Sequence, residues 1–513
     1  MVELFSGGLL PIIYVFGFAG ALGLSRHQWI VARLTALLGL LTTLAAAVGA
    51  VLSWSPLDKL GLTLALLVSL LGWVIIDYAA RYLQGEPDQP LFVRAMLYSL
   101  ACVSVLVVSR NLLVIVLAWS GTSMGLHFLL TYYRARKAAQ IVAHKKFIIS
   151  RMADLCLLAA LVLIWNSCGT LTLDGISAYV GVTASLPSPM CWAACLFALA
   201  AILKSAQLPL HGWLIQVMEA PTPVSALLHA GIVNIGGFVL IRLAVLIAAV
   251  PAAQAMLVLT GSLTAVLAGL VMMTRISIKV RLAWSTCAQM GFMLMEVGLG
   301  LYALALLHLV AHSLYKAYAF LTAGETVAEA KRDDLLISRG TARSPLWYLG
   351  TGALSVAVVA GAVFLWRQAV PGMRLPAEAA TIMALGLAPL LWLEQDASAM
   401  RLGLGMIRIA ALTQLYLAWH LLFAHLAPAA MAPSGFLQAW AIVSFSLLYT
   451  AQIWLRHAPR GRLAQRLFPW AYCGFYLDEI FTRLTFKFWP ARLAPERATV
   501  RDNPNHPHIG DMV

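Results

Sequence analysis

The stretch Lys204-Ser-Ala-Gln-Leu-Pro209-Leu-His-Gly-Trp213 places a charged amine and a proline inside an otherwise apolar part of the chain. In a lipid-facing helix the amine would be costly, and the proline would leave backbone carbonyl groups without donors. Both are tolerated where a helix faces a protein interior or a water-filled cavity. The pairing therefore predicts a helix that is broken inside a membrane and lines an ion or proton path.

The rest of the chain is also apolar. Its 513 residues are 61% hydrophobic and 11% charged, with a mean hydropathy of +0.85, whereas soluble domains carry about 25% charged residues. Apolar runs long enough to span a bilayer recur throughout, and we count about 14–15 of them. The first run, residues 8–24, lacks a basic leader and a cleavage site, so we expect a true span. The sequence predicts an all-α polytopic membrane protein.

The net charge of +14 lies mainly in short loops, which argues against nucleic-acid binding. The basic clusters follow odd-numbered spans, and the cluster after the fifth span includes Lys145 and Lys146. By the positive-inside rule that side is cytoplasmic, which puts the N-terminus outside and the C-terminus inside. The seven cysteines are scattered, mostly within spans, and are expected to pack rather than to form disulfides or a metal site.

A titratable stripe is predicted on one helix. His308, His312 and Lys316 are spaced i, i+4, i+8, so they share one face at steps of about 6 Å that one water can bridge. Histidine titrates near neutrality, and a lysine in apolar surroundings can load and release a proton. Because intramembrane ionisable residues are usually functional, we favour a proton relay over hydrogen-bonded core residues. A zinc site at the two histidines is the weaker interpretation, since a third ligand is not evident.

Other ionisable residues carry open alternatives. Lys204 is a second relay centre, unless it snorkels to an interface. His229 either links Lys204 to the stripe or bonds to a neighbouring carbonyl. Asp154 either tunes a lysine or pairs with Arg151, just before it in the sequence. Glu296 is an isolated carboxylate with a weak functional case.

Three segments resemble the antiporter-like membrane subunits shared by respiratory complex I and the Mrp-type cation/proton antiporters, most closely the NuoL type. They are the Lys204 stretch, Pro221-Thr-Pro-Val-Ser-Ala-Leu-Leu-His229-Ala and His308-Leu-Val-Ala-His312-Ser-Leu-Tyr-Lys316-Ala. The resemblance extends from about Ser69 to Val327. It implies two inverted five-helix repeats, each with a broken helix and a buried lysine.

The same resemblance implies roles and boundaries. Lys204 is the first-repeat lysine, Asp154 matches a family acidic position, and His229, His308, His312 and Lys316 form a connecting axis. The expected divisions are N-terminal transmembrane helices in 1–95, a first antiporter-like repeat in 96–250, a second in 251–400, C-terminal transmembrane helices in 401–456, and an amphipathic segment with a cytoplasmic tail in 457–513.

Two departures from that family stand out. Its fifth helix carries a glutamate that partners the first lysine, in a Trp-Glu-Gly context. Here the helix reads Trp119-Ser120-Gly121, so the ion pair is expected to be missing. The lysine of the second broken helix is replaced by Arg367, which hardly releases its proton, so a simple lysine relay is in doubt there.

The stretches beginning at Trp119 and at His144 resemble the DabB-type membrane subunit of the two-component inorganic-carbon accumulation system. That resemblance implies a bacterial inner membrane and a large soluble partner of the DabA type, similar to β-carbonic anhydrases. The partner would hold zinc, with no cofactor on this chain, and a flow of protons or sodium ions would drive CO2 hydration to bicarbonate. The alternatives are a proton-translocating subunit of a complex I, hydrogenase or Mrp assembly, and a non-conducting scaffold for a soluble enzyme.

Overall fold

The computed structural model describes residues 8–24, 27–52, 58–133, 136–183, 185–324, 343–370, 375–392, 399–429, 434–458 and 461–489. Throughout these ranges the regular structure is helical, apart from one isolated β-bridge between Asn111 and Thr172. Eleven of the described helices are long and apolar enough to cross a membrane, and four shorter apolar helices lie among them. The predicted all-α polytopic fold is confirmed.

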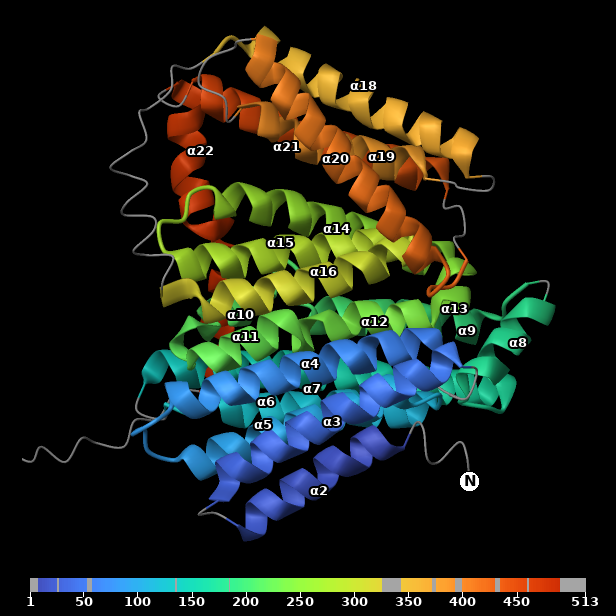
Figure 1. Ribbon diagram of the computed structural model, residues 1–513, viewed down its shortest axis with the longest axis vertical. Coiled ribbons are helices and arrows are strands. Elements are labelled where there is room, and N and C mark those ends of the chain that lie inside the picture. Colours follow the sequence, from blue (N-terminus) through green and yellow to red (C-terminus); the bar gives the residue numbers. More distant parts are fainter. Residues whose placement is uncertain are drawn as a thin grey trace, which may run out of the picture.

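The helices lie side by side in a stack along the longest axis of the molecule (Figure 1). The blue end of the stack holds α2 (Leu9–Gly23), α3 (Gln28–Val51) and α4 (Lys59–Tyr82). The next helices are α5 (Gln89–Val108) and α6 (Leu112–Leu130). One large hydrophobic core runs from these helices into the middle of the stack.

The middle of the stack contains the predicted broken helix. The long α7 (Lys137–Cys168) and short α8 (Leu173–Val182) precede α9 (Ser188–Lys204). The chain then leaves the helix, with Ala206 at φ 52° and a cis Leu208–Pro209 peptide bond. It resumes as α10 (Gly212–Ile215), η2 (Gln216–Glu219), α11 (Thr222–Ala230), η3 (Ile232–Asn234), α12 (Ile235–Arg242) and α13 (Ala244–Ala248). Proline lacks an N–H donor, which explains why the helix breaks here.

Three closely packed helices follow: α14 (Pro251–Met272), α15 (Ile278–Gly298) and α16 (Tyr302–Leu321). A Cβ built on Gly261 would lie 2.5 Å from the carbonyl oxygen of Gly291. Only glycine allows the backbones of α14 and α15 to approach so closely, as is common between membrane helices. This contact fixes α15 against its neighbours and so positions the residues that it carries.

The far end of the stack has a smaller core of its own, to which α14, α15 and the turn before α16 contribute. Its helices are α18 (Pro345–Ala369), α19 (Ala377–Leu387), η4 (Ala388–Trp392), α20 (Ala399–Ala424) and α21 (Gly435–His457). In Figure 1 they form the orange group above α14 and α15.

The C-terminal segment is amphipathic, as predicted. It consists of α22 (Arg462–Tyr472), η5 (Gly474–Tyr476) and α23 (Glu479–Phe488). In Figure 1, α22 runs across the stack past the ends of α14 to α16 instead of parallel to them. It packs on α14, and α23 packs on α7. The predicted tail beyond residue 489 lies outside the described residues.

Candidate ion-conducting site

The first charged centre lies where α9 breaks. The side chain of Lys204 is 2% exposed, and its Nζ lies 2.7 Å from Oδ1 of Asp154 on α7. Oδ2 of Asp154 lies 2.7 Å from Nη2 of Arg151 and accepts a hydrogen bond from the Ser120 hydroxyl at 2.9 Å. Asp154 therefore pairs with the lysine and the arginine at once, and Lys204 does not snorkel.

This geometry settles which group neutralises Lys204. Ser120 stands where the resembled family carries a glutamate, and we expected that ion pair to be missing. For Asp154 we left open whether it tunes a lysine or pairs with Arg151, and it does both. Asp154 supplies that carboxylate from the neighbouring helix, and Ser120 holds it in place through its hydroxyl. The ring of Trp119 adds a cation–π contact, with Lys204 Nζ 4.9 Å from its centroid.

A second charged centre joins α15 to α16. Nδ1 of His308 lies 2.8 Å from Oε2 of the buried Glu296. The two helices meet through a tight turn in which Gly300 has φ 72°, a left-handed conformation that favours glycine. This turn brings residues 296 and 308 face to face. The interpretation of Glu296 as an isolated carboxylate was wrong. A glutamate inside an apolar helix could have indicated a functional residue from the sequence alone.

The remaining stripe residues continue inward along α16. The rings of His308 and His312 are 6.0 Å apart, one helical turn from each other. The fully buried Lys316 donates to the Leu282 carbonyl at 3.0 Å and to the Ser285 hydroxyl at 2.9 Å. The stripe predicted from the i, i+4, i+8 spacing thus lies on one face of one helix.

His229, on α11, lies beside the α16 stripe. Its ring stacks on Phe320 of α16 at a centroid distance of 4.4 Å, and it is within electrostatic reach of Lys316. Neither ring nitrogen of His229 or of His312 has a hydrogen-bond partner among the described protein atoms. Both buried imidazoles therefore keep unused hydrogen-bonding capacity inside the protein.

These residues form what we call the buried charged row. It crosses neighbouring elements of the stack in Figure 1: α7 packs on α9, α9 on α12, α12 and α11 on α16, and α16 on α15. Its members in this order are Asp154, Lys204, His229, Lys316, His312, His308 and Glu296.

Arg367 lies apart from this row. It is exposed near the end of α18, and its Nη2 donates to the Leu375 carbonyl at 3.0 Å. A long basic side chain at a helix end readily caps a nearby carbonyl and keeps its charge in polar surroundings. Its relay role stays a prediction, without a contact to the other six predicted residues.

An open cavity of about 650 Å³ reaches one end of the row. It lies between α14 to α16 and the α19 to α21 group, and its lining is mainly apolar. Glu296 and His308 are in its wall, close to Gln289 and Tyr416. A molecule in this cavity could therefore contact the row at Glu296 and His308.

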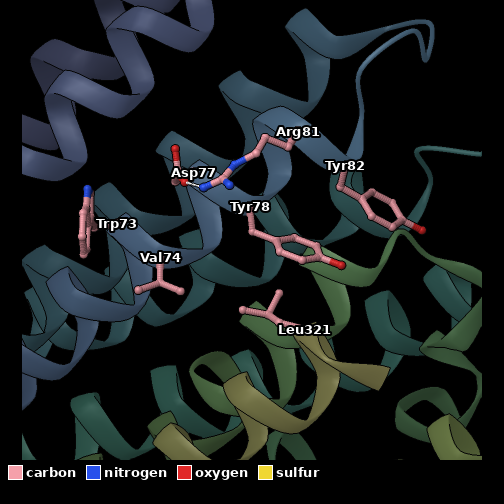
Figure 2. Close-up of a pocket in the computed structure, with 7 residues that line it drawn as sticks. All are labelled: Trp73, Val74, Asp77, Tyr78, Arg81, Tyr82 and Leu321. Carbon is pink, nitrogen blue, oxygen red and sulfur yellow. Dashed lines mark hydrogen bonds and ion pairs between the residues drawn. The ribbon is translucent and has the colours of Figure 1, made fainter. Parts of the chain in front are cut away.

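A second hollow, a groove of about 510 Å³, opens on α4 beside the end of α16. Figure 2 shows Asp77 paired with Arg81, and the ring of Tyr78 between Leu321 and the ring of Tyr82. The two tyrosine rings stack at a centroid distance of 5.8 Å. None of the residues that line this groove belongs to the buried charged row, so it does not give access to the row.

The C-terminal segment is tied to α7 by a buried ion pair. Lys145 Nζ, in a side chain that is 0% exposed, lies 2.5 Å from Oδ2 of Asp478 and 2.7 Å from the Thr482 hydroxyl. A Cβ at Gly212, at the start of α10, would lie 1.9 Å from the Asp478 carboxyl group. Only glycine at that position lets the segment lie against the broken helix.

Lys145 and Lys146 correct the charge assignment. We placed both in a basic loop cluster, but both are buried within α7. The cluster ran directly into an apolar stretch, so the sequence did not show where the helix begins. Lys146, Ser150 and Asp154 also repeat the i, i+4, i+8 spacing of the stripe on α16, a signal that we overlooked.

The described residues contain no group of three or more His, Cys, Asp or Glu side chains arranged to hold a metal ion. His308 pairs with Glu296, and its ring contacts that of His312. All seven cysteines are free thiols. The side chains of the row are amines, imidazoles and carboxylates, which are groups that can accept and release protons.

A membrane-spanning stack with a broken helix and a buried row of lysines, histidines and acids defines an antiporter-like, cation-conducting subunit. Residues 109–349 match the family model described as NADH:quinone oxidoreductase/Mrp antiporter. The chain is 38% identical to the "Probable inorganic carbon transporter subunit DabB" of Hydrogenovibrio crunogenus, over 94% of each chain. It is 39% identical to the corresponding DabB2 of Halothiobacillus neapolitanus, over 90% of this chain and 86% of the relative. The chain belongs to the DabB family of antiporter-like membrane subunits.

A solved structure of the Mrp complex from Dietzia contains a chain with the same fold. The TM-score is 0.61 at 22% sequence identity, over 93% of this chain and 59% of that one. This likeness concerns the fold alone.

Proposed function

We propose that this chain conducts protons along the buried charged row and thereby energises the hydration of CO2 to bicarbonate on a soluble partner. The single observation that carries the conduction step is the Lys204–Asp154 ion pair, buried at a helix break. His229 and the α16 stripe would continue the path from there. The carbon substrate is inferred from the DabB relatives, whose names describe inorganic carbon transporter subunits.

The row supports conduction because its members hold and release protons without large movements. Lys204 and Lys316 are amines, and His229 and His312 have buried ring nitrogens without hydrogen-bond partners among the described protein atoms. The first centre adds the carboxylate of Asp154, and the second adds the Glu296 carboxylate and the His308 imidazole. In a low-dielectric interior, a proton arriving at one amine raises the energy of a proton on the next. Repulsion of this kind would move protons along the row in single steps.

The partner in this proposal is a large soluble subunit of the DabA type, similar to β-carbonic anhydrases. It would hold the zinc ion, and zinc there would activate a water molecule for attack on CO2. The C-terminal segment, with exposed aromatic residues and arginines, would lie on the cytoplasmic face, in a bacterial inner membrane with the N-terminus outside. Conduction and catalysis would thus occur on different chains.

Two other functions remain as outcomes of the test. The family model that covers residues 109–349 also describes subunits of NADH:quinone oxidoreductases and Mrp antiporters, which supports a proton-translocating role in such an assembly. A non-conducting scaffold would hold a soluble enzyme with the same helices, and its function would not need the buried charged row.

The test starts with purification of this chain from its native membrane in mild detergent, followed by identification and zinc analysis of what accompanies it. A large soluble zinc protein supports the proposal, whereas quinone-reductase, hydrogenase or several antiporter subunits would move the chain to the other branch. In cells, we expect Lys316→Ala to abolish bicarbonate accumulation while the complex still assembles. Lys59→Gln, at an exposed lysine that begins α4, is the matched control. Normal accumulation with both Lys204→Ala and Lys316→Ala would favour the scaffold.

A further inference from the structure

Lys146 is a buried charge that the row described above does not use. It is 3% exposed, and its Nζ donates to the Ser150 hydroxyl at 2.6 Å. The ring of Trp213, just after the helix break, lies 4.8 Å from the same nitrogen. Within the described residues no carboxylate lies within ion-pair distance of Lys146, in contrast to its neighbour Lys145, which is paired with Asp478.

The position of Lys146 joins two features of the fold. Lys146, Ser150 and Asp154 lie on one face of α7. Lys146 is eight residues before Asp154, which places it about 12 Å along the helix axis toward the C-terminal segment. Lys146 is within electrostatic reach of Lys204, Asp154 and Arg151. It therefore stands between the segment that packs on the start of α7 and the ion pair at the break.

The charges around Lys146 are unbalanced. Lys146, Lys204 and Arg151 are three cations, and Asp154 is the one carboxylate among these four interacting groups. Buried charge without compensation is unfavourable, whereas arginine cannot release its proton. The strain is relieved when one of the two lysines is neutral, and the pair of lysines can then share a single proton.

We propose that Lys146 is a proton-carrying residue that loads the Lys204–Asp154 pair from the side of the C-terminal segment. The inference rests on the proposed proton conduction and extends it. In the step, an N–H bond of the Lys146 ammonium group breaks and one forms on the neutral Lys204 amine, through the Ser150 hydroxyl or a water molecule. Lys146 ends as a neutral amine and Lys204 as an ammonium ion, so the total charge is unchanged. Trp213 stabilises the charged form of Lys146 through its ring face.

The experiment measures proton flux with a pH-sensitive dye in vesicles that contain the intact assembly. Lys146→Met fills a similar volume and removes a buried charge, a change that often leaves stability unaffected. Lys146→Arg keeps the charge but cannot give up the proton. We expect both to lower flux roughly 100-fold, the scale on which a positioned proton-transfer group contributes. Lys146→His should restore part of the flux with a different pH profile, and Lys59→Gln should match the wild type.

The outcomes separate this inference from the proposed function. Wild-type flux in Lys146→Met or in Lys146→Arg would overturn the role of Lys146 while conduction stands, and the arginine result alone would indicate a purely electrostatic role. If Lys146→Met fails to assemble, Lys146→Arg decides. If the wild-type assembly carries no protons, the proposed function fails and the inference with it.

Discussion

Replacing Asp154 by asparagine removes one charge from the Lys204 centre and keeps the shape of the side chain. The Nζ–Oδ1 distance of 2.7 Å corresponds to about 6 kcal/mol of Coulomb attraction at an effective dielectric constant of about 20. Removing one partner of a buried pair generally costs about 3–5 kcal/mol, because the other charge is left without compensation. Lys204 is 2% exposed, so water provides little screening. If the loss of Asp154 destabilises the protonated form of Lys204 by about 3 kcal/mol, proton flux should fall roughly 150-fold.

The assay for Asp154→Asn is dye-monitored proton flux in vesicles, normalised to the amount of assembled complex. Ser120→Ala serves as a graded comparison, because it removes only the hydroxyl that donates to Asp154. A hydrogen bond to a charged group contributes about 1.5–3 kcal/mol, so its effect should be smaller or at most comparable. Undiminished flux in an assembled Asp154→Asn variant would refute the view that this ion pair is part of the conducting path.

Three further changes probe other contacts. Ser120→Glu places a second carboxylate beside Asp154, and we expect an altered pH profile of flux with assembly intact; an unchanged profile would show that this position does not act on the ion pair. Glu296→Gln removes the charge that faces its histidine, a loss of about 1.5–3 kcal/mol that should lower flux about tenfold or more, whereas normal flux would place this pair outside the path. Asp478→Asn leaves Lys145 buried without a counter-ion at a cost of about 3–5 kcal/mol, and should make the C-terminal segment sensitive to limited proteolysis. Glu479→Gln, in an exposed pair, should have little effect; equal proteolysis of the two variants would contradict the view that the Lys145–Asp478 pair holds the segment on α7.

Hydropathy and residue spacing predicted much of this protein. The apolar runs gave the polytopic helical fold, since a bilayer permits few other structures. Lys204 followed by Pro209 located the broken helix, and the period of the α-helix placed His308, His312 and Lys316 on one face. These features are local, because each depends on residues within a few turns of one another.

The pairings between helices were not predictable in the same way. Asp154 and Lys204 are 50 positions apart, on α7 and α9, and their contact depends on how these helices pack. Without that packing, the serine at position 120 indicated a missing ion pair. Lys145 was assigned to a loop because its counter-ion, Asp478, lies in a segment 333 positions away. A charge pattern along the sequence cannot show which distant group will neutralise a given residue.

That separation has a consequence for biosynthesis. Lys145 enters the membrane with α7, but Asp478 leaves the ribosome 333 residues later, a delay of roughly 17–67 s at usual rates of bacterial translation. Throughout this interval the nascent protein contains an ammonium group whose final neutralising partner does not yet exist. In a translation product that stops before Asp478, Lys145 would never gain this counter-ion.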